Sequence, residues 1–337
     1  MLNSFTKGYF PETDFPTRTI DAEKCSKCGR CFETCPTLGF QWQKGEVPTP
    51  VGYGGYAQAC LNCGNCTAVC PSDAITMTGV YSVREGRYKN SLEGKMAFPD
   101  PLCLNGAKRY DGFKEELTPV ERAIFERRSN RLFKDKKVPR EVICRILEAG
   151  RFAPSAGNCQ PYKFVVIQDQ SIIHDLERLS MKTMLRPLKN LYLDHKGTRP
   201  LWKRIVFNFL SIFMATKFDP RPFTAMEKAD VRKDKIYFDA PLVIMILKDT
   251  RGVSNPDLDA GICAQNMVLA AHSLGLGTCY IGLAIEPLNY PLMMGLRKRL
   301  SIRHPFEAVT SIAIGYPKGK IDGVVKRDTP QVAWIGS

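Results

Sequence analysis

The sequence lacks the features that define several common classes of protein. No stretch approaches the ~18 consecutive apolar residues that a membrane-spanning helix needs. Residues 1–12 contain no apolar segment typical of a secretory signal peptide. No Gly-x-Gly-x-x-Gly follows a predicted strand, so a Rossmann site for NAD(P)H is not indicated. The few histidines match no metal-ligand spacing; they are His174, His195, His272 and His304.

Cysteine, in contrast, is abundant, and eight of the 13 cysteines fall into two runs with one spacing. Each run reads Cys-x2-Cys-x2-Cys-x3-Cys-Pro, the spacing of bacterial ferredoxins. Structural zinc uses Cys-x2-Cys pairs, whereas a cubane [4Fe-4S] cluster needs four thiolates that converge from several directions. Disulfides need an oxidising compartment, and the scattered remaining cysteines fit a reducing cytoplasm. The predicted cluster ligands are Cys25, Cys28, Cys31, Cys35, Cys60, Cys63, Cys66 and Cys70.

The resemblance to two-cluster ferredoxins implies two [4Fe-4S] clusters with crossed ligands, because there the fourth cysteine of each run binds the other cluster. Carried over, one cluster takes the first three cysteines of the first run and Cys70, and the other takes those of the second run and Cys35. The chain departs from this family in the spacer of residues 36–59 between the two runs. We interpret the spacer as a surface insertion, and a docking loop for a redox partner is the alternative.

Length and charge predict two domains. The 337 residues are 44% hydrophobic and 24% charged, which is ordinary for a soluble globular protein. We predict a ferredoxin-like domain at 1–80, a linker at 81–117 and a second domain at 118–337. Within the second domain, residues 180–238 hold 13 basic and 5 acidic residues, and we expect a variable lid insertion there. No nucleic-acid recognition motif accompanies the net charge of +14, so we expect no nucleic-acid partner.

Helices and strands alternate in the second domain, which indicates an α+β fold. Thr118, Pro119 and Glu121 form a capping box that predicts the start of a helix. Apolar periodicity predicts two further helices, at 140–152 and at 257–274, where Gly275 ends the second. Strands are expected at 164–167, 241–247, 279–281 and 309–314, and two more, at 18–21 and 74–77, flank the cysteine runs.

Four short motifs follow one another in the second domain. They are Arg127-Arg128-Ser129-Asn130-Arg131, Ala153-Pro154-Ser155-Ala156-Gly157-Asn158-Cys159-Gln160-Pro161, Gly275-Leu276-Gly277-Thr278-Cys279-Tyr280-Ile281-Gly282, and Gly315-Tyr316-Pro317 followed by Lys326-Arg327. In this order they resemble the nitroreductase-like FMN flavoproteins. The resemblance implies a three-layer α/β/α domain and a homodimer in which both protomers contribute to each flavin site. A ferredoxin unit fused ahead of this domain is an arrangement seen in anaerobe sequences of the same family.

The residue chemistry of these motifs suits FMN, whose phosphate needs cations and hydroxyl groups. The first motif and the C-terminal cations supply them, while the small residues of the second motif allow the backbone to approach a planar ring. By resemblance, a backbone N–H near Gly282 lies beside the reactive flavin nitrogen. Many family members have a Glu where this chain has Ile281, so we transfer no acid role. The predicted FMN contacts are Arg127, Arg128, Ser129, Arg131, Pro154, Ser155, Ala156, Asn158, Ile281, Gly282, Lys326 and Arg327.

These features predict an enzyme that passes electrons from a ferredoxin-type donor through two clusters to FMN. FMN would then reduce a small organic acceptor, such as a nitro compound, a quinone or an activated double bond. Two alternatives stay open: substrate oxidation with electrons leaving to ferredoxin, and a non-enzymatic redox carrier or sensor. Family members can also use NAD(P)H without a Rossmann motif. Tyr280 and Tyr316 are candidate proton donors beside solvent, and the sequence does not select between them.

The apolar stretch at residues 201–215 reads as a helix with a narrow polar stripe of Arg204, Asn208 and Ser211. Three interpretations stay open. The helix packs on the domain or on a dimer partner, it forms a lid with cationic edges that favours an aromatic or anionic substrate, or it makes a peripheral membrane contact. The last is the least favoured.

Overall fold

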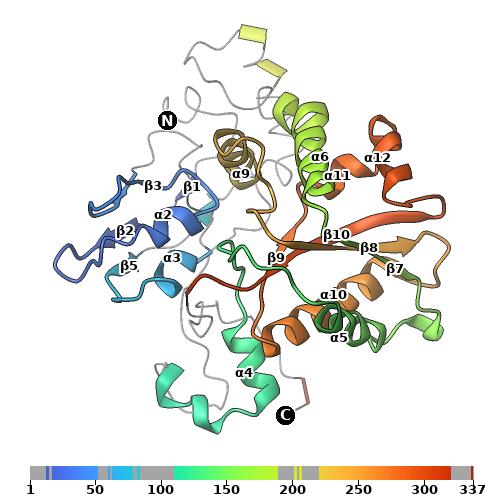
Figure 1. Cartoon of the computed structure of the whole chain (residues 1–337), viewed down its shortest axis with the longest axis horizontal. Coiled ribbons are helices and arrows are strands. Elements are labelled where there is room, and N and C mark those ends of the chain that lie inside the picture. Colours follow the sequence, from blue (N-terminus) through green and yellow to red (C-terminus); the bar gives the residue numbers. More distant parts are fainter. Residues whose placement is uncertain are drawn as a thin grey trace.

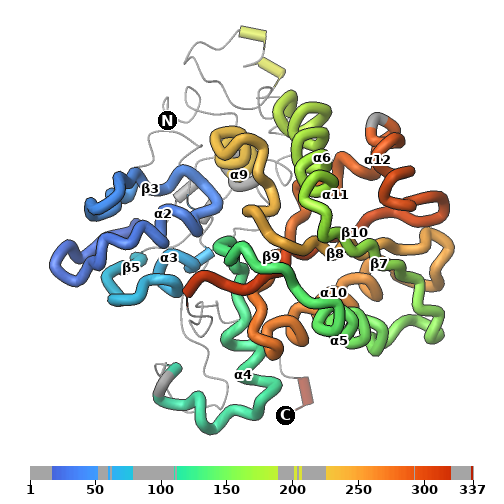
Figure 2. The backbone as a smooth tube through the Cα atoms, in the orientation of Figure 1, coloured from blue at the N-terminus to red at the C-terminus, as the bar shows by residue number. Residues whose placement is uncertain are grey.

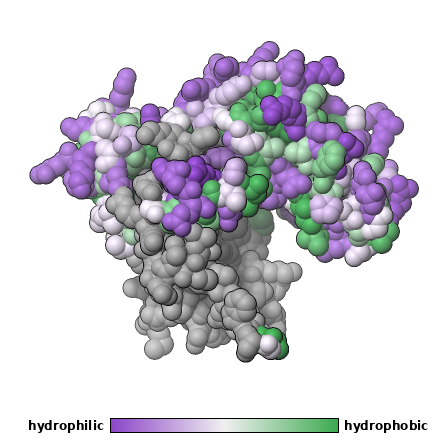
Figure 3. Space-filling view, turned by 90° about the horizontal axis from the view of Figure 1, so that it is seen from below, coloured by the Kyte–Doolittle hydropathy of each residue, from purple (hydrophilic) through white to green (hydrophobic). Residues whose placement is uncertain are grey.

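The computed structural model contains a small N-terminal module beside a larger domain built on a four-stranded sheet (Figure 1). On the face shown in Figure 3, the described residues present a largely hydrophilic surface with smaller hydrophobic areas between. No helix among the described residues is long and apolar enough to cross a membrane. The structure describes residues 13–14, 17–51, 60, 63–78, 82–83, 110–188, 201–202, 205–206, 220–319 and 335–336.

An antiparallel sheet with the strand order β7-β8-β10-β9 forms the centre of the larger domain. All four strands predicted for this domain are present, with their ends shifted by a few residues. The first six residues of β8 are all buried, because helices cover both of its faces. The strands are β7 (Tyr162–Ile167), β8 (Leu242–Asp249), β9 (Gly277–Ile281) and β10 (Phe306–Gly315).

One face of the sheet packs against α5 (Arg140–Arg151) and α10 (Pro256–Ser273), the two long helices predicted from the sequence. Side chains alternate between the faces of a strand, so every second residue of β8 meets these helices. The helices approach each other closely at Gly150, where a Cβ would lie 2.4 Å from Met267 Cε. The β-strand residues in this layer are Leu242, Ile244, Ile246, Ile312 and Ile314.

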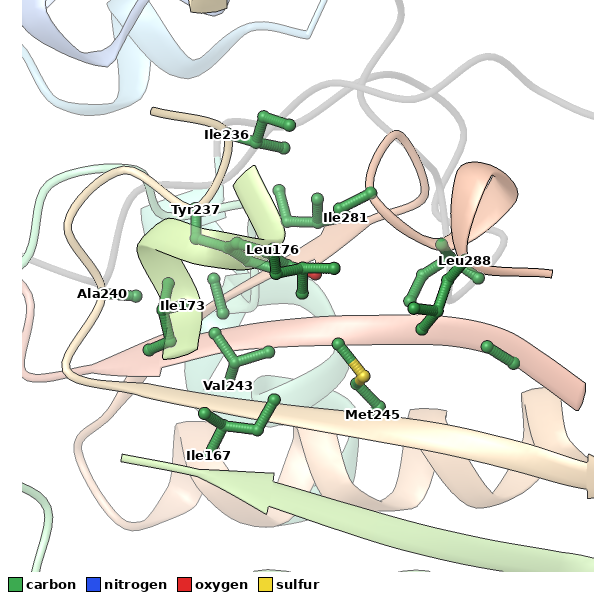
Figure 4. Close-up of a cluster of buried hydrophobic side chains, with 14 of the residues drawn as sticks. Ile167, Ile173, Leu176, Ile236, Tyr237, Ala240, Val243, Met245, Ile281 and Leu288 are labelled. Atoms are coloured by element: carbon green, nitrogen blue, oxygen red, sulfur yellow. The ribbon is translucent and has the colours of Figure 1, made fainter. Parts of the chain in front are cut away.

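Shorter helices cover the opposite face of the sheet. Figure 4 shows Ile173 and Leu176 of α6 lying over Val243 and Met245 of β8, with Tyr237 beside them. The sheet therefore lies between two helical layers, which confirms the three-layer α+β prediction for this domain. The elements on this side are α6 (Gln170–Ser180), its π-helical continuation η5 (Met181–Leu185), α11 (Ile285–Leu288), η7 (Pro291–Met293) and α12 (Met294–Arg299).

The N-terminal module holds both cysteine runs between short strands. As predicted, the two strands that flank the runs are present, and they pair with each other as β2 and β5. Two short helices repeat one local design, because each begins after a glycine with positive φ, Gly29 (φ 68°) and Gly64 (φ 63°). The elements are β1 (Thr13–Asp14), β2 (Thr17–Ile20), α2 (Arg30–Thr34), β3 (Phe40–Gln41), β4 (Thr49–Pro50), α3 (Asn65–Ala68), β5 (Ile75–Thr78) and β6 (Ser82–Val83).

Part of the spacer between the runs folds onto the module. Its first half forms the β3–β4 hairpin, and the Trp42 indole donates from Nε1 to the Glu46 carbonyl at 2.9 Å. The Trp42 ring lies 5.9 Å from that of Phe32 and covers Gly29 so closely that a Cβ there would meet it at 2.5 Å. Residues 52–59 lie outside the described residues, so the docking-loop alternative stays a prediction.

Helix α4 (Pro119–Glu126) begins at the predicted capping box. The Glu121 N–H donates to Thr118 Oγ1 at 3.3 Å, and the Thr118 N–H donates to Glu121 Oε2 at 2.7 Å. Two 3-10 turns, η2 (Tyr110–Gly112) and η3 (Lys114–Glu116), precede α4 and pack against it through aromatic rings. The end of the predicted linker is therefore ordered against α4, and the domain boundaries themselves stay predictions.

Helix α9 (Pro220–Val231) runs between the module and the sheet domain (Figures 1 and 2). It belongs to the predicted lid insertion, of which residues 189–200, 203–204 and 207–219 lie outside the described residues. Residues 201–202 and 205–206 are helical, and the three interpretations of 201–215 stay predictions.

Candidate functional site

The first group of thiols comes from both cysteine runs. Cys25, Cys28, Cys31 and Cys70 line one cavity of the module, together with apolar residues of β2 and β5 such as Ile75. Desolvation raises the pKa of the Cys31 thiol to about 12, and the neighbouring charges of Cys28 and Cys70 add to this. A free thiolate is therefore unfavourable here, and a bound cationic metal centre would stabilise it.

The second group combines Cys60, Cys63 and Cys66 with Cys35. Desolvation raises the pKa of Cys66 well above its usual value, and the charges of Cys63, Cys35 and Cys60 raise it further. The structure thus brings the fourth cysteine of each run to the first three of the other run, which is the crossed arrangement that the resemblance implied. Among the described residues, no three His, Cys, Asp or Glu side chains converge closely enough for a single metal ion; the first group lines a cavity instead.

The first flavin motif, residues 127–131, lies along the edge strand β9. Ser129 bridges to Thr278, and the Asn130 N–H donates to the Thr278 carbonyl at 2.7 Å. This approach requires glycine at position 277, where a Cβ would lie 2.8 Å from the Asn130 side chain. Arg128 is buried and Arg127 half-buried at this edge.

The fourth motif lies on the other side of the same segment. The Lys134 N–H donates to the Tyr316 carbonyl at 2.7 Å, and the Lys318 N–H donates to the Leu132 carbonyl at 2.9 Å. The first, third and fourth motifs, which are far apart in the sequence, are therefore neighbours in space. Lys326 and Arg327 lie outside the described residues, so their role stays a prediction.

The second motif lies elsewhere. The Ala156 N–H donates to Asp259 near the start of α10, whereas the first motif lies near His272 at its end. At 1.5 Å per residue, the 13 residues between these contacts separate the two motifs by roughly 20 Å. Within one chain, the structure does not bring Pro154, Ser155, Ala156 and Asn158 to the other predicted FMN contacts.

The local geometry of the second motif leaves it open to a partner or ligand. Its turn contains Gly157 and Asn158 with positive φ, 57° and 53°. Pro154 and Asn158 are exposed, and Ser155 Oγ accepts from the Gln160 N–H at 3.0 Å. Cys159 and Gln160 line an open groove here. For Pro154, Ser155, Ala156 and Asn158, the predicted contact with FMN therefore requires a site that this segment joins from outside.

The third motif ends at an exposed peptide. Ile281 is buried, Gly282 is exposed, and among the described residues the Gly282 N–H has no hydrogen-bond acceptor. The carbonyl of this Ile281–Gly282 peptide accepts from Ser311 Oγ at 2.7 Å. Ser311 in turn pairs with the Tyr237 hydroxyl at 3.0 Å, and both side chains are completely buried. A buried network thus fixes this peptide, while Gly282 itself is exposed.

The module contacts the first motif directly. Asn65 of α3 donates from Nδ2 to the Ser129 carbonyl, and Arg131 Nη1 lies 3.9 Å from Cys63 Sγ. The sequence prediction missed Asn65, because its place between two cysteines carries no signal of a contact 64 residues away. It assigned Arg131 to the flavin, whereas the structure places its guanidinium at the second thiol group.

Helix α9 contacts the module as well. Arg232, just past its end, donates to the Glu33 carbonyl at 3.3 Å, and the Lys228 ammonium lies 4.7 Å from the centre of the Phe32 ring. The sequence prediction also missed Lys228, whose only signal was membership of a basic segment. The module is therefore contacted by the first motif at the second thiol group and by α9 at α2.

The two candidate proton donors, Tyr280 and Tyr316, have different surroundings. Desolvation raises the pKa of Tyr280 to about 12, and its hydroxyl donates to Gln265 Oε1 at 3.2 Å. Tyr316 has Lys136 over its ring at 4.4 Å. The structure therefore singles out neither residue as a catalyst.

Comparison with known proteins identifies both parts of the chain. A family model described as the nitroreductase family matches residues 124–316, more than half of the chain. The chain belongs to the nitroreductase family. It is thus an oxidoreductase by family, and a model of a 4Fe-4S dicluster domain matches residues 24–75.

Several relatives show the range of this family. A nitrobenzene nitroreductase of Ectopseudomonas oleovorans is 28% identical over 48% of this chain and 72% of its own length. An iodotyrosine deiodinase 1 of Sus scrofa is 25% identical over 57% of this chain and 59% of its own. A nitroreductase with bound FMN from Desulfitobacterium hafniense DCB-2 is 20% identical, with a TM-score of 0.46, over 65% of this chain and 99% of that structure.

Proposed function

We propose that this nitroreductase-family chain is an iron–sulfur flavoenzyme that reduces a small organic acceptor with electrons supplied through its own ferredoxin module. The observation that carries the proposal is the contact between the second thiol group and the first flavin motif, with Arg131 Nη1 at 3.9 Å from Cys63 Sγ. An electron carrier held by these thiols would lie directly beside a flavin held by that motif.

The two thiol groups suit two [4Fe-4S] clusters, which exchange single electrons when bound. In this proposal Cys25, Cys28, Cys31 and Cys70 hold the outer cluster, and Cys35, Cys60, Cys63 and Cys66 hold the inner one. Cys28 is exposed and Cys25 half-buried, whereas three of the four inner thiols are buried. The exposure of Cys28 supports entry of electrons at the outer cluster from a ferredoxin-type donor.

FMN, when bound, collects single electrons and passes two of them with a proton to the acceptor. The chain's own residues would orient it: Arg127, Arg128 and Ser129 suit the phosphate by charge and by their common position along β9. The exposed Gly282 N–H suits a ring nitrogen, and the buried Ser311 hydroxyl fixes that peptide from behind.

A homodimer would complete the flavin site. The second motif lies at the far end of α10 from the first, so one chain presents only part of the predicted FMN contacts. The exposed Pro154 and Asn158 of one protomer are free to reach the motifs of a second protomer across an interface. We therefore propose two composite sites per dimer.

The acceptor class follows from the family and from the chemistry of a bound flavin. We propose a small aromatic or anionic acceptor, such as a nitro compound, a quinone or a compound with an activated double bond. The names of the relatives, a nitrobenzene nitroreductase and an iodotyrosine deiodinase, support an aromatic one. We also propose a cytoplasmic location, in keeping with cysteines that are all free among the described residues.

An anaerobic optical titration of the purified protein tests this function. Reduced ferredoxin is added to one sample and NAD(P)H to another, and the cluster and flavin bands are followed. We expect ferredoxin to bleach both bands. Rapid bleaching of the flavin by NAD(P)H alone would instead favour a nicotinamide-driven reductase or electron flow outward through the clusters. A protein replete in iron but without a flavin band would refute the FMN assignment.

A further inference from the structure

Cations from three separate parts of the chain surround the inner thiol group. Arg18 comes from β2, Arg131 from the first flavin motif and Lys228 from α9. Arg18 and Lys228 are only 5% and 4% exposed, so both charges lie in the interior. Buried cations are rare in proteins unless negative charge compensates them.

Arg131 has the most direct contact. Its Nη1 lies 3.9 Å from Cys63 Sγ, within the range of a hydrogen bond to sulfur. Burial lowers the pKa of its guanidinium, but the charges of Cys279, Cys63 and Cys35 outweigh this and the pKa is raised. The guanidinium also lies 5.8 Å from the centre of the Phe238 ring, which helps to hold it in place.

Lys228 approaches the inner thiol group from α9. The ammonium lies 4.7 Å from the centre of the Phe32 ring, one turn of α2 before Cys35. Just past α9, Arg232 donates to the carbonyl of Glu33, two residues before Cys35. Arg18 lies 4.7 Å from the centre of the Phe40 ring, which packs in one core cluster with Cys35 and Cys66.

The charged side chains near the outer thiol group are less buried. Its cavity is lined by one half-buried cation, Arg30, and two of its thiols, Cys25 and Cys28, are partly or fully exposed. Lys24 lies beside this run but is 66% exposed and paired with Asp21 at 3.3 Å, so water screens it. Among the described residues, the cations near the inner group, Arg18 and Lys228, are therefore more deeply buried than Arg30 and Lys24 near the outer group.

This difference matters for reduction, because one added electron makes a cluster and its thiolates more negative by one charge. Burial disfavours the added negative charge. Nearby cations favour it, and their effect is stronger where the local dielectric constant is low. Net charge, hydrogen bonds to sulfur and exposure are the factors by which a protein sets cluster potentials. A deeply placed cluster without cations would be harder to reduce than its exposed neighbour, and electrons would stop before the flavin.

We propose that Arg131 and Lys228 are positioning residues that raise the reduction potential of the inner cluster, so that the outer cluster can reduce it. This inference rests on the proposed function. The electron lost by the outer cluster is the one gained by the inner cluster, and the ferredoxin-type donor replaces it. Arg131 belongs to the first flavin motif, so it also joins the inner cluster to the flavin site.

A redox titration of the complete protein tests this proposal. Midpoint potentials are measured with dithionite and mediators, and the reduced clusters are followed by electron paramagnetic resonance. We expect Arg131→Gln and Lys228→Met each to make reduction of one cluster about tenfold less favourable, a shift of ~59 mV for one electron. The other cluster should keep its potential. Arg131→Lys should restore part of the shift because it keeps the charge.

Lys24→Gln is the matched control. It removes an exposed cation beside Cys25 of the outer group, and we expect the potential of neither cluster to change. Unchanged potentials in Arg131→Gln and Lys228→Met, at wild-type iron content, would overturn the inference. If Arg131→Gln does not retain its clusters, Lys228→Met decides the question by the same criterion. A wild-type protein with fewer than two clusters, or without flavin, would refute the proposed function instead, so the two failures are distinguishable.

Discussion

At the scale of single residues, burial separates cysteines that look alike in the sequence. Cys263 lies in α10 with no exposed surface, and desolvation raises its pKa to about 12. Cys144 and Cys159 are exposed. The sequence grouped all three only as cysteines outside the cluster runs, because burial depends on which face of a helix or loop meets the core.

This difference predicts the pattern of thiol alkylation. At pH 8 we expect iodoacetamide to modify Cys144, since this exposed thiol meets the reagent, while Cys263 stays unmodified. Because its pKa is raised, Cys263 remains protonated in the folded state as the pH rises past the ordinary value of 9.0 toward 12. Peptide mass spectrometry gives the answer, and equal labelling of Cys263 and Cys144 in the folded protein would contradict the buried placement.

Gly277 is a second residue whose role depends on contact. A Cβ at this position would lie 2.8 Å from the Asn130 side chain, and backbone atoms of Asn130 are bonded to the same strand. We expect Gly277→Ala to lower the free energy of unfolding by about 1–3 kcal/mol through overpacking. It should also reduce FMN retention, because the first motif must move away from β9.

Gly261→Ala provides the control for that variant. Gly261 lies inside α10, and a Cβ there meets nothing within 4 Å. We expect it to raise stability by roughly 0.5–1 kcal/mol, because alanine is the better helix former. Denaturant unfolding and flavin absorbance per chain measure both effects. A Gly277→Ala protein with normal stability and flavin content would show that the first motif does not need this close approach.

At the scale of elements, local patterns predicted what local interactions determine. The capping box at Thr118, the apolar periodicity of α5 and α10, and the apolar run of β8 each reflect forces within a few residues, and all are found. The separation of the second motif from the first was not predictable in this way. This separation depends on the length and direction of α10, a helix that is adjacent to neither of these two motifs in the sequence.

The capping box allows a test of how α4 supports the first motif, which begins immediately after Glu126. Thr118→Ala removes the side chain that accepts from the Glu121 N–H at 3.3 Å. We expect a loss of about 1 kcal/mol in the free energy of unfolding. Thr118→Ser should recover most of it, because the serine hydroxyl can accept the same hydrogen bond. Equal stability of the alanine and serine variants would contradict a capping role.

At the scale of the whole molecule, the sequence predicted the parts of the site but not their arrangement. The cysteine spacing predicted the eight ligands, and the resemblance to two-cluster ferredoxins implied their crossing. Neither carried a sign that the first motif would contact α3 and Cys63 or that α9 would contact α2, because these segments approach one another only in the folded chain. The separation of the second motif from the others is the basis of our proposal that the flavin site is shared between two chains.

Mixed dimers test that sharing. Arg127→Glu alters the first motif with a charge that repels phosphate, and Asn158→Arg alters the exposed second motif. If each site takes one motif from each protomer, either variant alone disrupts both sites of its dimer. A dimer with one chain of each kind has one site that carries both changes and one site that carries neither.

The two variants, given different affinity tags, are co-expressed, and dimers that carry both tags are isolated. We expect about one FMN per mixed dimer, by flavin absorbance, and little FMN in either variant alone. The separately purified variants, mixed after folding without exchange of chains, serve as the control. Two results would contradict the proposal: mixed dimers that bind no more FMN than either parent, or an Asn158→Arg protein that keeps two FMN per dimer. In either case the second motif does not complete its partner's flavin site.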